Sequence, residues 1–137
     1  IDYKGRSISI SGDTIYDENL INNSKNVDVL FHESMSLELL DLINRGAKNS
    51  GNFVAEIVTI DILDYHTPIL DVVKAANEAN VKHLVFYHHL PAPRNQLMED
   101  IMYRGVDEIM ENWTASHDGT MLVLPINSDE IIVTSIE

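Results

Sequence analysis

Histidine and carboxylate side chains gather at four places along the chain. Three of these clusters, at residues 11–14, 32–34 and 88–89, follow apolar stretches with the character of strands. The fourth, at residues 64–68, precedes an amphipathic segment. Strand ends hold catalytic groups rigidly while the adjoining loops expose them. Imidazole and carboxylate are the ligands of a divalent metal where thiolates are absent. The sequence therefore predicts a His/carboxylate metal site where these segments converge.

Each cluster also has an ordinary structural explanation. Gly12-Asp13-Thr14 taken alone is typical of a turn with a capping aspartate, and a histidine after a buried strand is more often a hydrogen-bonded structural group than a ligand. His88 and His89 are adjacent, so on a regular strand only one of them can enter a given site. Only the four clusters taken together favour a metal or catalytic site over these structural explanations.

The segments that must position these groups alternate between strands and helices, an α/β-type order. Period-two alternation and short apolar runs predict the strands, and 3.6-residue periodicity with capping residues predicts the helices. The expected strands are 6–11, 27–31, 81–87 and a terminal hairpin of 121–124 with 130–134. The expected helices are 17–25, 36–47 capped by Ser36, 67–79 capped by Thr67 with Pro68 in first position, and most of 98–113, where Gly105 is a point at which the helix can break. The segment 54–62 fits either type.

The composition of the chain limits the kinds of partner that it can bind. The 137 residues include 9 Lys+Arg against 22 Asp+Glu, a net charge of −13, which disfavours nucleic acid because binding to its backbone needs clustered basic residues. The chain has no Cys, so any metal must be held by His and carboxylates. No apolar run approaches the roughly 20 residues of a membrane span. We expect a soluble single domain without membrane contact, compatible with cytoplasm or periplasm.

The motifs, taken in order, resemble the C-terminal half of the metallo-β-lactamase superfamily. They are Ser-Gly-Asp-Thr at 11–14, Asp-Val-Leu-Phe-His-Glu-Ser at 28–34, His-Thr-Pro at 66–68 and Leu-Val-Phe-Tyr-His at 84–88. The resemblance covers about residues 3–133 and is strongest to the branch containing ribonuclease Z and the bacterial arylsulfatase-like hydrolases. It implies an α+β fold, half of an αββα four-layer sandwich, with a mixed sheet, covering helices and a C-terminal hairpin.

The resemblance also implies roles for individual residues. Asp13 matches the family's bridging aspartate and His88 its last ligand histidine, two of the several ligands that hold two zinc ions in the complete domain, with manganese as the alternative. His66 matches the histidine near the scissile phosphate. Glu33 matches the acidic residue of the His-Glu-Ala-Thr segment, where Ser34 replaces the usual Ala, and such a carboxylate orients a neighbouring imidazole.

The chain departs from the family in what it lacks. The His-x-His-x-Asp-His motif and a further ligand histidine belong to the family's N-terminal half, and neither is present in residues 1–137. We therefore expect this chain alone to be inactive. An isolated half would also expose the apolar face of its sheet, so we expect a partner: the missing N-terminal half or a second copy of the chain, in a homo-oligomer. The start without Met suggests that the chain is truncated or processed.

These observations favour a fragment of a dinuclear metal-dependent hydrolase of a phosphate or sulfate ester or a similar small substrate. An arylsulfatase-like activity is favoured over tRNA 3′ processing because the chain is acidic. Two alternatives stay open: a non-catalytic binding or assembly module that retains the half-fold, and an unrelated three-layer α/β domain that binds a small ligand at its strand ends.

Overall fold

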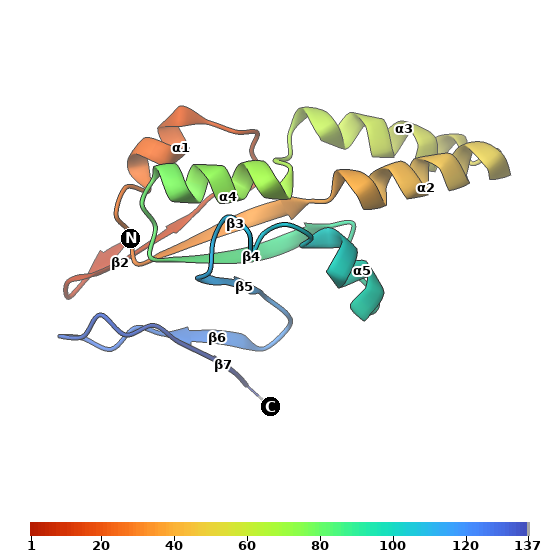
Figure 1. Cartoon of the computed structure of the whole chain (residues 1–137). Coiled ribbons are helices and arrows are strands. Elements are labelled where there is room, and N and C mark those ends of the chain that lie inside the picture. Colours follow the sequence, from red (N-terminus) through yellow and green to blue (C-terminus); the bar gives the residue numbers. More distant parts are fainter. Residues whose placement is uncertain (137) are drawn as a thin grey trace.

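The computed structural model describes residues 1–136 and places helices on one side of a five-stranded sheet and a hairpin on the other (Figure 1). The strands of the sheet, in spatial order, are β1 (Asp2–Tyr3), β2 (Arg6–Ile10), β3 (Val29–Met35), β4 (His83–Leu90) and β5 (Trp113–Ala115). The helices are α1 (Glu18–Asn23), α2 (Leu37–Ser50), α3 (Phe53–Asp61), the 3₁₀ turn η1 (Ile62–Asp64), α4 (Ile69–Glu78) and α5 (Gln96–Met102). The hairpin consists of β6 (Thr120–Val123) and β7 (Ile132–Ser135).

The sheet is mixed. β1 pairs antiparallel with β2, and β2 through β5 run parallel. Parallel strands finish at the same edge of a sheet, and ligand sites of open sheets lie beyond that edge. The ends of β2, β3 and β4 are therefore brought together although they are far apart in sequence. The mixed sheet, the covering helices and the terminal hairpin confirm the α+β class expected from the sequence.

The core lies between the sheet and α4. Leu30, Leu84 and Phe86 point to the helix-covered face and are buried in one cluster with Val72 and Val73 of α4. Each such side chain contributes about 1.5–3 kcal/mol relative to exposure. This burial fixes the position of α4 and of the loop that leads into it. Within residues 1–136 no helix has the length and apolarity needed to cross a membrane.

Several sequence expectations are confirmed, with shifted ends. The strand at 6–11, the helix after Asp17, the helix after Ser36 and the terminal hairpin are all present, and both capping side chains accept backbone N–H groups. The ambiguous segment 54–62 is the helix α3, whose cap is Asn52. The predicted Thr67 cap is wrong, because the Thr67 hydroxyl donates to the Thr14 carbonyl and leaves α4 without a side-chain cap.

Two other expectations are corrected. Both β3 and β4 continue farther than their apolar runs, so His32, Glu33 and His88 lie within strands rather than after them. The predicted helix over 98–113 ends at Met102, and residues 113–115 form the edge strand β5. Gly105 adopts a φ of +86°, which no α-helix contains, and this accounts for the break.

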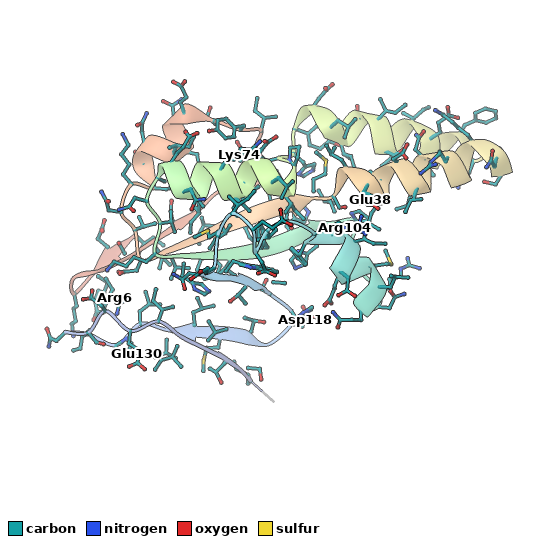
Figure 2. The ribbon with its side chains drawn as sticks, viewed as in Figure 1. Arg6, Glu38, Lys74, Arg104, Asp118 and Glu130 are labelled. Carbon is teal, nitrogen blue, oxygen red and sulfur yellow. The ribbon has the colours of Figure 1, made fainter. Side chains whose placement is uncertain are left out.

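The hairpin is tethered to the sheet through Arg6, which lies above it in Figure 2. The Arg6 guanidinium is buried and its Nε donates to Asp28 Oδ2 over 3.0 Å. Its Nη1 donates to three carbonyl oxygens of the loop between β6 and β7, those of Pro125, Ser128 and Glu130. Arg6 therefore joins β2 to the residue before β3 through a buried ion pair, and to the C-terminal segment through hydrogen bonds.

Candidate metal centre

Three side chains converge at the carboxyl edge of the sheet. Asp13, His66 and His88 each offer a ligand atom, and these atoms lie within 4.8 Å of one another. The Oδ1 atom of Asp13 is 2.8 Å from Nδ1 of His88, and the rings of His66 and His88 meet edge to face with centroids 5.5 Å apart. Among residues 1–136 this is the one group of at least three ligand-type side chains so closely spaced. The structure therefore brings together the two predicted ligands and the predicted histidine beside them.

Asp13 lies in the loop that follows β2. Gly12 adopts a φ of +64°, a conformation that favours glycine, and its N–H donates to the Tyr87 hydroxyl over 3.0 Å. The Ser11 N–H continues the pairing with β3 by donating to the Phe31 carbonyl. The turn is thus held against β3 and β4 while the Asp13 carboxylate stays exposed. The supporting role of Tyr87 was not predicted, although the residue immediately precedes His88.

His88 is presented by a β-bulge. The pairing of β3 with β4 passes from Glu33 opposite Tyr87 directly to Ser34 opposite His89, so His88 is an extra residue without a partner. Its φ is +45°, in the left-handed region that few residues other than glycine adopt. Bulges commonly redirect a side chain next to a functional site. Here the bulge turns the imidazole of His88 toward Asp13.

His89 lies outside the cluster, as expected for one of two adjacent histidines. Its Nε2 is 2.8 Å from the Ser116 carbonyl, which can only accept, so this nitrogen carries the proton. Its Nδ1 then accepts from the hydroxyls of Tyr103 at 2.8 Å and Ser34 at 2.9 Å. Burial lowers the pKa of His89 and favours this neutral form. His89 ties the end of β4 to β3, to α5 and to the segment after β5. No sequence pattern indicated these contacts.

A buried acid supports His66. Glu33 is fully buried, its Oε1 accepts the Thr67 N–H over 2.6 Å, and its Oε2 lies 3.3 Å from Nδ1 of His66. Burial raises the pKa of Glu33 to about 7; the Thr67 N–H opposes this shift and the Asp13 carboxylate adds to it. Burial lowers the pKa of His66. Within residues 1–136, neither Oε2 of Glu33 nor Nδ1 of His66 makes a hydrogen bond, although the two buried atoms lie 3.3 Å apart, and Nε2 of His66 is left for a metal or a substrate.

The remaining histidines have structural surroundings. His32 is buried on the helix-covered face, its Nδ1 donates to the Glu33 carbonyl over 2.7 Å, and burial lowers its pKa to about 4. His83 Nε2 lies 2.8 Å from Thr114 Oγ1 across β4 and β5. His117 is exposed, 3.7 Å from a carboxylate oxygen of Glu99. None of these three belongs to the close cluster.

The donor set fits a divalent cation. One carboxylate and two imidazoles match the three protein ligands and open position of a catalytic zinc site, and manganese accepts the same atoms. The direct contact between Asp13 and His88 shows that both side chains already point to one place. A second ion would need ligands beyond the three that residues 1–136 bring together.

Comparisons with known proteins bear on the fold of the chain. No family model matches the chain. Ribonuclease Z of Halalkalibacterium halodurans is 29% identical over 123 residues, which are 90% of this chain and 34% of that protein. The metallo-β-lactamase fold protein YhfI of Bacillus subtilis superposes with a TM-score of 0.54 at 14% identity, over 81% of this chain and 36% of that one. The chain thus spans about a third of the length of the proteins it matches. Its fold is part of a metallo-β-lactamase fold, in which metal ions are generally bound.

Proposed function

We propose that this chain is the C-terminal half of a metal-dependent hydrolase domain whose dinuclear centre is completed by an N-terminal half. The convergence of Asp13, His66 and His88 within 4.8 Å carries the proposal. Similarity to ribonuclease Z over 90% of the chain supports it. Asp13 and His88 would hold the ions, zinc by preference and manganese as the alternative. When bound, the metal supplies Lewis acidity and an activated water near neutral pH.

The residues of this chain then have distinct tasks. His66 would hold a proton at Nε2 and place it on the leaving oxygen of the substrate, or stabilise charge developing there. Glu33, buried against Nδ1 of His66, would fix the tautomer that makes this transfer feasible. Thr67 holds this segment in place through two groups: its N–H donates to the Glu33 carboxylate, and its hydroxyl donates to the Thr14 carbonyl in the Asp13 loop.

The sheet face away from the helices is where the N-terminal half would pack. Ile8, Ile10, Phe31 and Tyr87 line a cavity of about 370 Å³ there, shared with the hairpin residue Thr120. An apolar sheet face of a globular domain is normally covered by a second layer. The metallo-β-lactamase sandwich has a second sheet in this position, and the proposal places the missing ligands on it.

Two observations favour different substrates. The net charge of −13 favours a small phosphate or sulfate ester over a polynucleotide, unless the other half supplies a basic surface. The similarity to ribonuclease Z favours a phosphodiester in RNA. We place the small ester first because the charge is a property of this chain itself.

The test uses the complete protein. Its metal content is measured by elemental analysis, and hydrolysis is assayed with bis(4-nitrophenyl) phosphate, 4-nitrophenyl sulfate and a 3′-extended tRNA precursor, before and after chelation. We expect two ions per complete domain and chelator-sensitive hydrolysis of a small ester. Cleavage of the tRNA precursor alone would support the ribonuclease Z-like activity instead. A protein with neither metal nor hydrolysis would be the non-catalytic assembly module.

A further inference from the structure

A cavity of about 740 Å³ opens beside the metal centre, on the side of His88. It is lined by residues of β4, of the loop after β4 and of the turn between β5 and β6, among them Tyr87, His88, Pro93, His117 and Asp118. Figure 2 shows Asp118 at that turn. The volume is typical of small-molecule sites, which measure about 300–1,000 Å³. Asp13 and His66 do not line the cavity, so it adjoins the metal cluster through His88 alone.

The cavity has the position of a substrate group that stays on the phosphorus. In the proposed function, on which this inference rests, His66 protonates the leaving oxygen, so the leaving group lies next to His66. A group in the cavity lies next to His88 instead and remains in the product. A sulfate monoester has no such group, because its other three substituents are bare oxygens. The cavity therefore favours an ester with a second organic substituent.

The turn after β5 is held by backbone hydrogen bonds on both sides. The Ser116 N–H donates to the Phe86 carbonyl over 2.9 Å, and the Ser116 carbonyl accepts from Nε2 of His89 over 2.8 Å. The His117 N–H donates to Thr120 Oγ1 over 2.8 Å, and the His117 carbonyl accepts the Thr120 N–H over 2.9 Å. A group on a backbone fixed in this way loses little freedom when a ligand binds. His117 is therefore positioned at the cavity before any substrate arrives.

The imidazole of His117 is accessible to a ligand. Its side chain is 60% exposed, and its Nε2 lies 3.7 Å from a carboxylate oxygen of Glu99, too far for a hydrogen bond. Exposed ion pairs of this kind contribute little to stability. In a neutral imidazole one ring nitrogen donates a hydrogen bond and the other accepts one. His117 can therefore bind a ligand group that does both, such as a hydroxyl.

The surroundings of His117 favour a neutral group that carries hydroxyls. The carboxylates of Asp118 and Glu99 flank His117 in a chain with a net charge of −13, so a second anionic group would be repelled. The Asp118 carboxylate can accept a hydrogen bond from a hydroxyl. Tyr87 and Pro93 add apolar surface to the walls. A sugar offers hydroxyls and apolar surface together and matches both kinds of wall.

We infer that His117 is a substrate-binding residue, whose imidazole forms a hydrogen bond with a hydroxyl of a sugar that the substrate retains on its phosphorus. His117 does not belong to the metal cluster and takes no part in bond cleavage. Its contribution is therefore to binding, and it should change KM rather than kcat. The effect should be confined to substrates that carry the sugar.

The test compares two esters that share the 4-nitrophenol leaving group and differ in the retained group, thymidine 5′-(4-nitrophenyl phosphate) and ethyl 4-nitrophenyl phosphate. The complete protein should have the lower KM for the thymidine ester. His117→Ala should raise this KM about 3- to 10-fold, the effect of one hydrogen bond, and leave kcat unchanged. Both constants for the ethyl ester should stay as in wild type. His117→Gln keeps a donor and an acceptor, so it should recover most of the lost affinity.

Glu99→Gln is the matched control, because it removes the ion pair of His117 and leaves the imidazole in place. It should leave KM for both esters unchanged. Equal changes for the two esters in His117→Ala would show that His117 supports the fold and would overturn the inference. The same loss of affinity in Glu99→Gln would overturn it as well.

A binding measurement separates this inference from the proposed function. Titration calorimetry with thymidine 5′-monophosphate gives a dissociation constant without turnover. We expect it to be about 3- to 10-fold higher in His117→Ala than in wild type, with equal constants for ethyl phosphate. This result in a protein that neither holds metal nor hydrolyses either ester would support His117 as a binding residue and refute the hydrolase. Equal constants for thymidine 5′-monophosphate, or no binding to either protein, would overturn the inference even in an active hydrolase.

Discussion

The Oδ1 atom of Asp13 lies 2.8 Å from Nδ1 of His88, although 74 residues separate them in the chain. The pairing depends on a glycine turn after β2 and on a bulge in β4. Both features direct side chains to one point beyond the carboxyl edge of the sheet.

Asp13→Ala should remove at least one metal ion from the complete protein, because the carboxylate is the one anionic donor of the cluster. Asp13→Asn keeps the size and one oxygen, so it should lose affinity without changing the fold. Elemental analysis gives the metal content and circular dichroism reports on the fold. Unchanged metal content in both variants would show that Asp13 is not a ligand.

His66→Ala should lower turnover by about 10²–10⁴-fold while metal content stays near normal, since loss of a general acid has effects of that size. Glu33→Gln, which is nearly isosteric, should lower turnover by a smaller factor, because the imidazole remains but its tautomer is no longer fixed. Turnover and metal content are measured together. Loss of an ion in His66→Ala would make His66 a ligand instead.

Gly12→Ala should destabilise the protein by about 1–2 kcal/mol, the usual penalty of the left-handed conformation for a residue with a Cβ. An added Cβ would meet no atom within 4 Å, so the penalty is conformational. Gly46→Ala in α2 is the control. It also has open space and lies in a helix, so it should stabilise by about 0.5–1 kcal/mol. Urea unfolding measures the free energy of unfolding of both variants. Equal changes in the two variants would contradict the left-handed conformation of Gly12.

His89→Phe should be more destabilising than Tyr103→Phe. The Tyr103 change removes one hydroxyl, worth about 1 kcal/mol, and leaves Ser34 as a donor to Nδ1 of His89. The His89 change leaves the Ser116 carbonyl and both hydroxyls without this partner. Because His89 adjoins the bulge, His89→Phe should also weaken metal binding. Metal affinity equal to that of Tyr103→Phe would show that the network does not support the bulge.

Acid should destabilise the protein partly through Asp28. Burial alone would raise the Asp28 pKa, but hydrogen bonds from Lys82 and Arg6 outweigh it and hold the pKa at about 2, below the ordinary 3.8. A lowered pKa means that the carboxylate stabilises the fold above pH 4, and that this contribution, about 2 kcal/mol, is lost as the pH falls from 4 to 2. Unfolding curves of wild type and Asp28→Asn should therefore converge in that range. A constant difference in the free energy of unfolding between wild type and Asp28→Asn from pH 6 to 2 would contradict this role of Asp28.

Much of the fold was predictable because local rules govern it. The caps at Asp17 and Ser36 and the alternation in 6–11 are short-range signals, and the structure agrees with them. The convergence of Asp13 with His88 was expected from family resemblance and from the way parallel strands end at one edge. The strand β5 at residues 113–115 was not expected, because pairing with β4 outweighs the helical pattern of the sequence after Gly105.

Details of the site depend on tertiary contacts that no local pattern encodes. A period-two strand predicts that His88 and His89 face opposite sides, but it does not predict the bulge that makes His88 an extra residue. Thr67 has the sequence of a helix cap, yet its hydroxyl binds the Asp13 loop. The burial of the polar residue Thr59 in α3 likewise depends on Asn44, which lies on another helix.

The three clustered side chains come from widely separated points along one chain. An ion held by Asp13 and His88 would close one long loop, which runs through α1, β3, α2, α3, α4 and β4. Loop closure restricts the unfolded chain, and binding that occurs only in the folded state adds directly to its stability. Metal binding would then stabilise the whole helical layer. Loss of the metal would increase local unfolding in parts of the protein remote from the metal centre.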